Sequence, residues 1–217
     1  MEGGMRGPSK RIVTIGIILL GGLTVAGLKW YKERNAQAIS GPLVRTKGNR
    51  NAPIHVIEFI DFQCPACAAG SAFLKDFMDK HPGLVRLELK YFPLEKIHHH
   101  SLISIRYAEC AGRQGRFWPF HDLLLTKQSQ WANLAEATSV FDLMAREVGV
   151  DPGRLKSCLA DEALDALINS DKEEGKSRGV NSTPTYFVNG QLVVGGKSLE
   201  VKLNQSMSEL KADTAVP

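Results

Sequence analysis

Two cysteines separated by two residues, in the segment Cys64-Pro65-Ala66-Cys67, have the spacing of a dithiol that exchanges electrons. A thiolate attacks a disulfide, whereas a protonated thiol hardly reacts. If the segment begins a helix, unpaired backbone N–H groups and the positive end of the helix dipole favour the thiolate form of Cys64. Pro65 suits the first helical position, because its φ angle is already helical and no N–H is needed there. Cys67 would then lie one turn behind Cys64, where it can resolve a mixed disulfide.

The residues around this segment predict the elements that would position it. The apolar run 54–60 predicts a buried strand directly before the cysteines, and residues 68–78 predict a helix after them. Residues 84–92 predict a second strand, which completes a β-α-β unit. The cysteines would therefore lie where a strand leads into the first turn of a helix.

Two other uses of this spacing, a zinc site and a structural disulfide, fit the sequence less well. A zinc site normally adds a second pair of cysteines or histidines at ligand spacing, but the remaining cysteines, Cys110 and Cys158, are isolated. A purely structural bond between Cys64 and Cys67 would close too small a loop to stabilise the fold much. We therefore predict redox chemistry at these two cysteines, with no bound metal and no cofactor beyond their own disulfide.

Thr183 and Pro184 are two further candidates for the site, and they precede a run of aromatic and β-branched residues. A proline is tolerated at the first residue of a strand, so residues 181–190 predict a turn that leads into a strand. A cis peptide bond there would place the Thr183 backbone beside the cysteine of another chain. The sequence does not specify the isomer.

The pattern Glu-Phe-Ile-Asp-Phe-Gln-Cys-Pro-Ala-Cys over residues 58–67, with the distant Thr-Pro strand, resembles the DsbA family of thiol-disulfide oxidoreductases in the thioredoxin superfamily. The resemblance covers roughly residues 53–210. It implies an α/β thioredoxin fold with a helical insertion: a core of residues 53–95 and 180–211, an inserted helical lobe of residues 96–179, and a short tail of residues 212–217.

The resemblance also implies roles for individual residues. Glu58 matches a buried acid that moves the proton of Cys67, although a surface strand residue is the alternative. Lys90 is a candidate partner for Glu58, or else an ordinary exposed lysine, and Asp61 is expected near the surface. The residues expected to position a bound substrate chain are Pro65, Ala66, Thr183 and Pro184.

The chain also departs from the best-known relatives. Enterobacterial DsbA has histidine where this chain has Ala66, and that histidine is thought to stabilise the reduced form of a strong oxidant. Ala66 therefore suggests a milder oxidant. Thr183 also occurs in reductase and isomerase relatives, so the direction of electron flow stays open, and a thioredoxin-like assembly module for copper or cytochrome maturation is the alternative without enzyme activity.

The segment between the predicted core halves carries helical signals. Val140, Met144 and Val148 repeat at four-residue spacing, and Asp151-Pro152 marks the start of another helix. Related proteins of similar pattern often carry a disulfide here, so the resemblance implies a structural Cys110–Cys158 bond. Two buried free thiols and an electron relay to Cys64 are the alternatives.

For the histidines and aromatic residues of this segment, a structural role is the preferred interpretation. Three consecutive histidines, His98-His99-His100, invite a copper site, but adjacent side chains point in different directions, and a solvated segment is the preferred interpretation. The aromatic residues Phe117, Trp118 and Phe120 are expected in the core of the lobe.

Charge and hydropathy divide the chain near residue 40. Residues 1–40 carry six Lys or Arg against two Asp or Glu, whereas residues 41–217 carry 21 of each, so the predicted folded part has no basic surface for nucleic acid. After a basic tail of residues 1–11, residues 12–31 predict a single membrane anchor. A cleaved signal sequence, with a cleavage pattern at 36–38, is the alternative. Residues 32–52 predict a linker that can include an edge strand at 43–46.

Together these features predict a membrane-tethered oxidase on the periplasmic, extracytoplasmic side of the cytoplasmic membrane, because disulfide chemistry belongs in an oxidising compartment. Its partners would be unfolded or reduced exported proteins, membrane lipid around residues 12–31, and a membrane quinone reductase of the DsbB or vitamin K epoxide reductase type.

Overall fold

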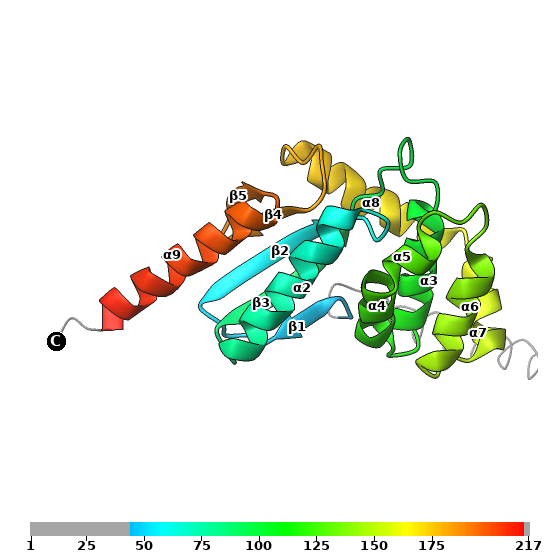
Figure 1. Cartoon of the computed structure of the whole chain (residues 1–217), viewed down its shortest axis with the longest axis horizontal. Helices are drawn as coiled ribbons and strands as arrows, with labels where there is room; N and C mark the ends of the chain where they lie inside the picture. Colours follow the sequence, from blue (N-terminus) through cyan, green and yellow to red (C-terminus); the bar gives the residue numbers. More distant parts are fainter. Residues whose placement is uncertain (1–43, 215–217) are drawn as a thin grey trace, which may run out of the picture. The chain divides into compact units, whose positions relative to one another are not determined.

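The computed structural model describes residues 44–214, and these form a mixed α/β domain (Figure 1). The elements in chain order are β1 (Thr46–Gly48), β2 (Ile54–Ile60), α2 (Pro65–Lys80), β3 (Val85–Tyr91), α3 (Ser101–Gly112), α4 (Phe117–Thr126), α5 (Gln128–Trp131), α6 (Thr138–Glu147), α7 (Pro152–Leu159), α8 (Ala163–Ser177), β4 (Thr185–Val188), β5 (Gln191–Val194) and α9 (Gly196–Thr214). The predicted strand at 54–60 is confirmed at both ends.

The strands within the described residues form one sheet in the order β1-β3-β2-β4-β5. β2 and β3 run parallel, and every other neighbouring pair is antiparallel. β2 is therefore the central strand, and its residue Glu58 lies opposite Leu89 on one side and Tyr186 on the other. The chain leaves this central strand and enters α2 through the cysteine segment.

Helices cover both faces of the sheet. Apolar side chains of α2 and α9 pack with those of β2, β3 and β4, and this core includes Ile54, Leu74, Tyr186, Leu199 and Leu203. On the other face, α8 approaches so closely that a Cβ atom on Gly175 would lie 2.9 Å from the ring of Phe59. This close approach explains why glycine occupies this position in the last turn of α8.

Helices α3 to α7 form a lobe beside the sheet, and α8 returns the chain from the lobe to β4 (Figure 1). Phe117 and Phe120 are buried in the lobe core, as expected. Trp118 differs from the expectation, because it is only partly buried and its indole N–H donates to the carbonyl of Thr46 in β1 at 3.1 Å. Cys110 of α3 and Cys158 of α7 form a disulfide across 48 positions, so the predicted bond is present.

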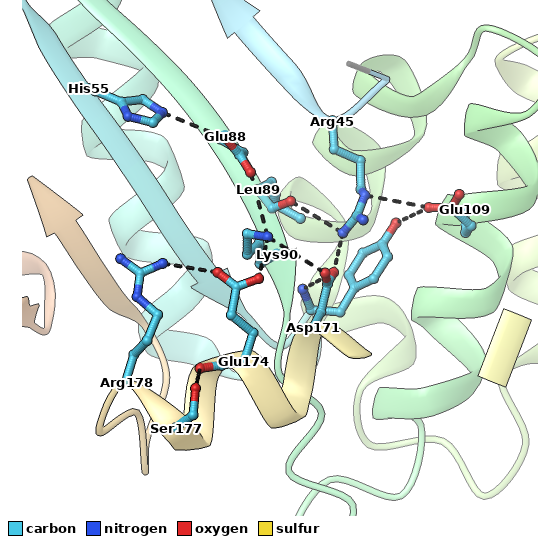
Figure 2. Close-up of polar contacts among 11 residues, drawn as sticks. Arg45, His55, Glu88, Leu89, Lys90, Glu109, Asp171, Glu174, Ser177 and Arg178 are labelled. Carbon is cyan, nitrogen blue, oxygen red and sulfur yellow. Dashed lines mark hydrogen bonds and ion pairs between the residues drawn. The ribbon is translucent and has the colours of Figure 1, made fainter. Parts of the chain in front are cut away.

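A buried charged network joins the sheet to the lobe (Figure 2). The Arg45 guanidinium contacts the carboxylate of Asp171 on α8 and lies 3.7 Å from that of Glu109 on α3. The Tyr91 hydroxyl donates to Glu109 at 2.9 Å, and the Tyr91 N–H donates to Asp171 at 3.0 Å. Three charges that are almost fully buried are therefore paired with one another.

The edge strand is shifted from its expected place. It spans Thr46–Gly48, antiparallel to β3, rather than 43–46. Arg45 directly precedes it: its carbonyl still accepts the Leu89 N–H of β3 at 3.0 Å, and its side chain enters the buried network. The predicted tail 1–11, anchor 12–31 and most of the linker 32–52 lie outside the described residues. Within residues 44–214, no helix is long and apolar enough to span a bilayer.

Candidate active site

The two cysteines of the Cys-Pro-Ala-Cys segment lie at the start of α2. Cys64 is the N-cap residue with extended φ and ψ angles of −74° and 120°, and Pro65 occupies the first helical position. The Cys67 N–H donates to the Cys64 carbonyl at 3.0 Å, which closes the first turn. Both are free thiols here, with Cys67 fully buried and Cys64 7% exposed.

The environment of Cys64 favours its thiolate. A hydrogen bond from the Cys67 thiol is the largest favourable contribution, and Thr183 and the N–H groups of Cys67 and Ala66 add to it. Partial burial opposes these effects, yet the pKa of Cys64 is lowered to about 5. Cys64 is therefore mostly ionised at neutral pH, as its place at a helix N-terminus predicts.

The environment of Cys67 has the opposite effect. Burial, followed by the hydrogen bond and the negative charge of Cys64, raises the pKa of Cys67 well above its ordinary value. The dithiol is thus asymmetric: the outer sulfur is an anion and the inner sulfur keeps its proton. Any reaction that consumes or forms a disulfide here must move that inner proton.

Thr183 and Pro184 lie beside Cys64, although 119 positions separate Thr183 from it. The Thr183-Pro184 peptide bond is cis, and the Cys64 Sγ lies 3.4 Å from the Thr183 carbonyl oxygen. Pro65 and Ala66 are exposed next to Cys64. The four residues predicted to position a substrate chain therefore surround this sulfur.

Glu58 is fully buried near Cys67, so the alternative of a surface strand residue is wrong. Burial raises the pKa of Glu58 to about 7, although the nearby hydroxyls of Ser71 and Tyr186 partly oppose this effect. Ser71 donates to Glu58 Oε1 at a long 3.3 Å, and Oε2 is buried without a well-formed hydrogen bond among the described residues. A carboxyl group with this pKa can accept or donate a proton at neutral pH.

Two expectations about neighbouring charged residues are wrong. Lys90 neither partners Glu58 nor extends freely into solvent. Across the sheet it lies opposite Phe59, whereas Glu58 lies opposite Leu89. The Lys90 ammonium instead contacts the Glu174 carboxylate at 2.7 Å (Figure 2). Asp61 is fully buried rather than near the surface. Its carboxylate accepts the N–H groups of Gln63 and Leu94, each at 2.9 Å, so it orders the loop before the cysteines.

The histidine run is also less solvated than expected. His98 Nδ1 lies 2.9 Å from Asp61, and the buried His100 lies 2.8 Å from the Leu134 carbonyl through Nε2, while only His99 is exposed. Within residues 44–214, no three His, Cys, Asp or Glu side chains are grouped as a metal site. His98 and His100 therefore hold the loop before α3 against Asp61 and Leu134.

Several residues that support the site were missed. The buried Gln128 side chain donates to the carbonyls of Phe62 and Cys64 at 2.7 and 3.0 Å, and no sequence pattern signals this contact. Tyr186 lies on β4 beside Glu58, and alternation from Pro184 could have placed it on the site's face. A Cβ atom on Gly70 would lie 2.2 Å from the Tyr186 hydroxyl oxygen, which explains the glycine in α2.

Relatives in sequence match this chain over only part of their own length. The chain is 33% identical over 156 residues to Na(+)/H(+) antiporter NhaA 1 of Salinispora arenicola, a match that covers 71% of this chain and 23% of that protein. The chain thus spans about a quarter of the curated relatives it matches.

Solved structures match over most of their length. A thioredoxin-like oxidoreductase from Silicibacter pomeroyi aligns with a TM-score of 0.63 and 26% identity, over 79% of this chain and 92% of that one. Wolbachia pipientis alpha-DsbA1 aligns with a TM-score of 0.65 and 21% identity, over 80% and 94%. Bacillus subtilis BdbD aligns with a TM-score of 0.65 and 23% identity, over 77% and 92%.

A family model described as thioredoxin matches residues 43–208, which include both cysteines of α2, the Thr-Pro strand and the inserted lobe. The chain therefore belongs to the thioredoxin family, and its fold is similar to that of DsbA-like thiol-disulfide oxidoreductases.

Proposed function

We propose that this protein is a dithiol oxidase that introduces disulfides into reduced or unfolded exported proteins. The observation that carries the proposal is the asymmetric dithiol, in which Cys64 has a pKa of about 5 and Cys67 is buried and protonated. A thiol of low pKa is a good leaving group, and a stabilised reduced form makes the disulfide form a stronger oxidant. This environment therefore favours oxidation of substrates even with Ala66 in place of histidine.

The reaction begins with the Cys64–Cys67 disulfide. A substrate thiolate attacks the Cys64 sulfur, the bond to Cys67 breaks, and the Cys67 sulfur takes a proton from Glu58. The substrate is then held in a mixed disulfide beside Thr183 and Pro184. A second substrate thiolate attacks the substrate sulfur of that mixed disulfide, and Cys64 leaves as a thiolate. Two electrons pass from the substrate dithiol to Cys64 and Cys67, and a membrane quinone reductase of the DsbB or vitamin K epoxide reductase type would reoxidise the pair.

The proposal also includes an extracytoplasmic location, tethered by residues 12–31. The disulfide between Cys110 and Cys158 supports this location, because structural disulfides persist mainly in oxidising compartments. If N-terminal sequencing of the mature protein begins at Ile39, the tether is wrong and the segment is a cleaved signal.

The redox state of Cys64 and Cys67 in intact cells tests the direction of electron flow. Cells are quenched with acid, and free thiols are labelled with a maleimide that adds mass. An oxidase is expected to be trapped mainly as the disulfide. A mainly reduced pair would contradict the oxidase and favour a reductase or isomerase, while full function of a Cys64→Ser variant would favour a binding module.

A further inference from the structure

A pocket of about 210 Å³ lies between α2 and α4 and reaches the buried acid of the active site. Its inner end includes the fully buried Glu58 and the almost fully buried His121. Exposed residues at its outer end include Lys75 and Thr126. Most of the remaining wall consists of alanine, leucine and methionine side chains. The pocket therefore lies between the buried Glu58 and exposed side chains of α2 and α4, and its lining does not include Cys64, Thr183 or Pro184.

Two buried polar atoms at this pocket lack a hydrogen-bond partner within the described part of the chain. They are Oε2 of Glu58 and Nε2 of His121. Buried polar atoms are nearly always paired, either with protein or with ordered water. The Tyr186 hydroxyl, which is likewise buried without a well-formed hydrogen bond, lies beside Glu58 and can also serve Oε2. For Nε2 of His121 the pocket itself has room for several water molecules, and the Ser71 hydroxyl on its wall adds a polar group that water can contact.

The other ring nitrogen of His121 is held in place. Nδ1 lies 2.8 Å from the carboxylate of Asp122, and the ring packs against Phe62, Phe117 and Trp118. Burial lowers the pKa of His121, despite the opposing effect of Asp122, so the ring is neutral at neutral pH. In the neutral tautomer that donates from Nδ1 to Asp122, Nε2 carries a lone pair and is a base.

We propose that this pocket is the route by which Glu58 exchanges its proton with solvent, and that His121 carries the proton between Glu58 and the pocket mouth through bridging water. The inference rests on the proposed function, because it supplies the proton that Cys67 takes from Glu58. His121 acts through Glu58 and does not touch the reacting sulfurs, so it is a positioning residue rather than a catalytic one.

One proton enters the site for each disulfide that is reduced. When substrate thiolate breaks the Cys64–Cys67 bond, Glu58 gives its proton to the Cys67 sulfur and becomes a carboxylate. A solvent proton then enters through water at the pocket mouth, is accepted at Nε2 of His121, and passes to Glu58 through a bridging water. Reoxidation of the pair reverses each transfer. No electron or other group moves through the pocket.

The charged and titratable groups around this route come from every element packed against it. They are Cys64, Cys67 and Lys75 near or on α2, Asp122 on α4, Lys47 on β1 and Tyr186 on β4. Lys47 disfavours a proton on His121 and Asp122 favours one, so a transient imidazolium would form between opposing charges. That balance suits a group that accepts a proton and releases it again.

The test measures the steady-state rate at which the protein oxidises a reduced dithiol peptide, from pH 5 to 9, in His121→Ala, with oxidised glutathione regenerating the disulfide. Repeated turnovers are needed because the first one uses the proton that Glu58 already holds. We expect the rate at pH 7 to 8 to fall by about 10- to 100-fold, in the range of a lost proton-transfer step. Added imidazole is expected to restore much of the rate, because it fits the vacated space and is a base. Pyrazole has nearly the same shape but is a far weaker base, and it should not restore the rate.

The matched control is His55→Ala, a partly exposed histidine on the same strand as Glu58 and outside the pocket, which should leave the profile unchanged. If His121→Ala does not fold, as judged by circular dichroism, Asp122→Asn tests the same route, because it replaces the carboxylate that holds the proton on Nδ1 with a neutral, weaker acceptor. We expect a slowing of about 10-fold for that variant.

An unchanged rate and pH profile in His121→Ala, or in Asp122→Asn if only that variant folds, would overturn the inference. So would equal rescue by imidazole and pyrazole, since that would mean that the ring only fills space. Failure of the proposed function is recognised separately: Cys64 and Cys67 would then be mainly reduced in intact cells, or Cys64→Ser would retain full activity. Failure of the inference alone leaves the pair mainly oxidised and Cys64→Ser inactive.

Discussion

At the scale of single residues, two sulfurs three positions apart have opposite acid-base character. Cys64 gains hydrogen bonds to its anion at the start of α2, and Cys67 loses solvent one turn further on. The sequence predicts this difference, because a Cys-x-x-Cys segment at a helix start fixes which sulfur faces the helix end. It does not predict Gln128, whose hydrogen bonds join residues more than 60 positions apart, or His121, which lines the pocket with Glu58 only because α4 packs beside α2.

Replacement of Glu58 by glutamine is expected to stabilise the protein in alkaline solution. The pKa of Glu58 is raised from 4.5 to about 7 in the folded state. Ionisation of Glu58 therefore lowers the free energy of unfolding as pH rises from about 4.5, and this loss is complete above about pH 7. A neutral amide removes this penalty, and the free energy of unfolding at pH 8.5 should rise by about 2–3 kcal/mol, with little change at pH 4. Urea unfolding of the disulfide form, in which neither active-site cysteine titrates, measures this.

The control for this variant is Glu173→Gln, an exposed residue of α8, which should change stability by less than about 0.5 kcal/mol at either pH. A pH-independent effect of Glu58→Gln would mean that the carboxyl group does not titrate in this range. The same variant should slow oxidation of a reduced peptide, because Cys67 loses its proton donor.

At the scale of elements, α2 must pass close to β4 for Cys64 to meet Thr183. Gly70 allows this approach, since a Cβ atom there would collide with the Tyr186 hydroxyl. In an open helix, Gly→Ala stabilises by about 1 kcal/mol. Here we expect Gly70→Ala to destabilise by about 1–3 kcal/mol, as overpacked cores do, and thermal or urea unfolding measures the change.

The double variant Gly70→Ala with Tyr186→Phe separates this collision from other effects. Without the hydroxyl, most of the loss should be recovered. Gly153→Ala on α7 is the control, because its Cβ atom would lie 3.4 Å from Asp151 in ordinary contact. An equal loss with and without the Tyr186 hydroxyl would show that the collision is not the cause.

The disulfide between α3 and α7 is expected to stabilise the lobe and to have no part in electron transfer. For a loop of 48 positions, the loop-entropy model gives about 4 kcal/mol, so Cys110→Ala with Cys158→Ala should lower the free energy of unfolding by up to about that amount. The folded variant should still oxidise a peptide at the original rate. A folded variant without activity would instead support an electron relay to Cys64.

Several elements follow from the sequence because their signals are local. Alternation and apolar content define β2, and Asp151-Pro152 starts α7 where the Asp151 side chain caps it. The displaced β1 and the buried Asp61 do not follow, because their positions depend on partners elsewhere in the chain. Glu58 lies between the two cases: its apolar neighbours indicate burial, but its true neighbours, Ser71 and Tyr186, come from tertiary packing.

At the scale of the whole described domain, the buried network of Figure 2 joins the first described strand, the sheet and the lobe. Arg45→Met would leave Asp171 and Glu109 buried without their cation. Breaking a buried pair in this way costs about 3–5 kcal/mol. Lys75→Met, which breaks an exposed pair with Asp79, should cost less than about 0.5 kcal/mol, and similar losses in the two variants on urea unfolding would contradict this account.

The central claim is that Cys64 is a thiolate that foreign chains can reach. Its direct test is the rate of alkylation of Cys64 by iodoacetamide in the reduced protein between pH 3 and 10, followed by mass spectrometry of the labelled peptide. We expect the rate to rise with a midpoint near pH 5, the pKa of this thiol, while Cys67 stays unmodified. A midpoint near the ordinary thiol value of about 8.5, or no labelling of Cys64 without denaturant, would contradict the account.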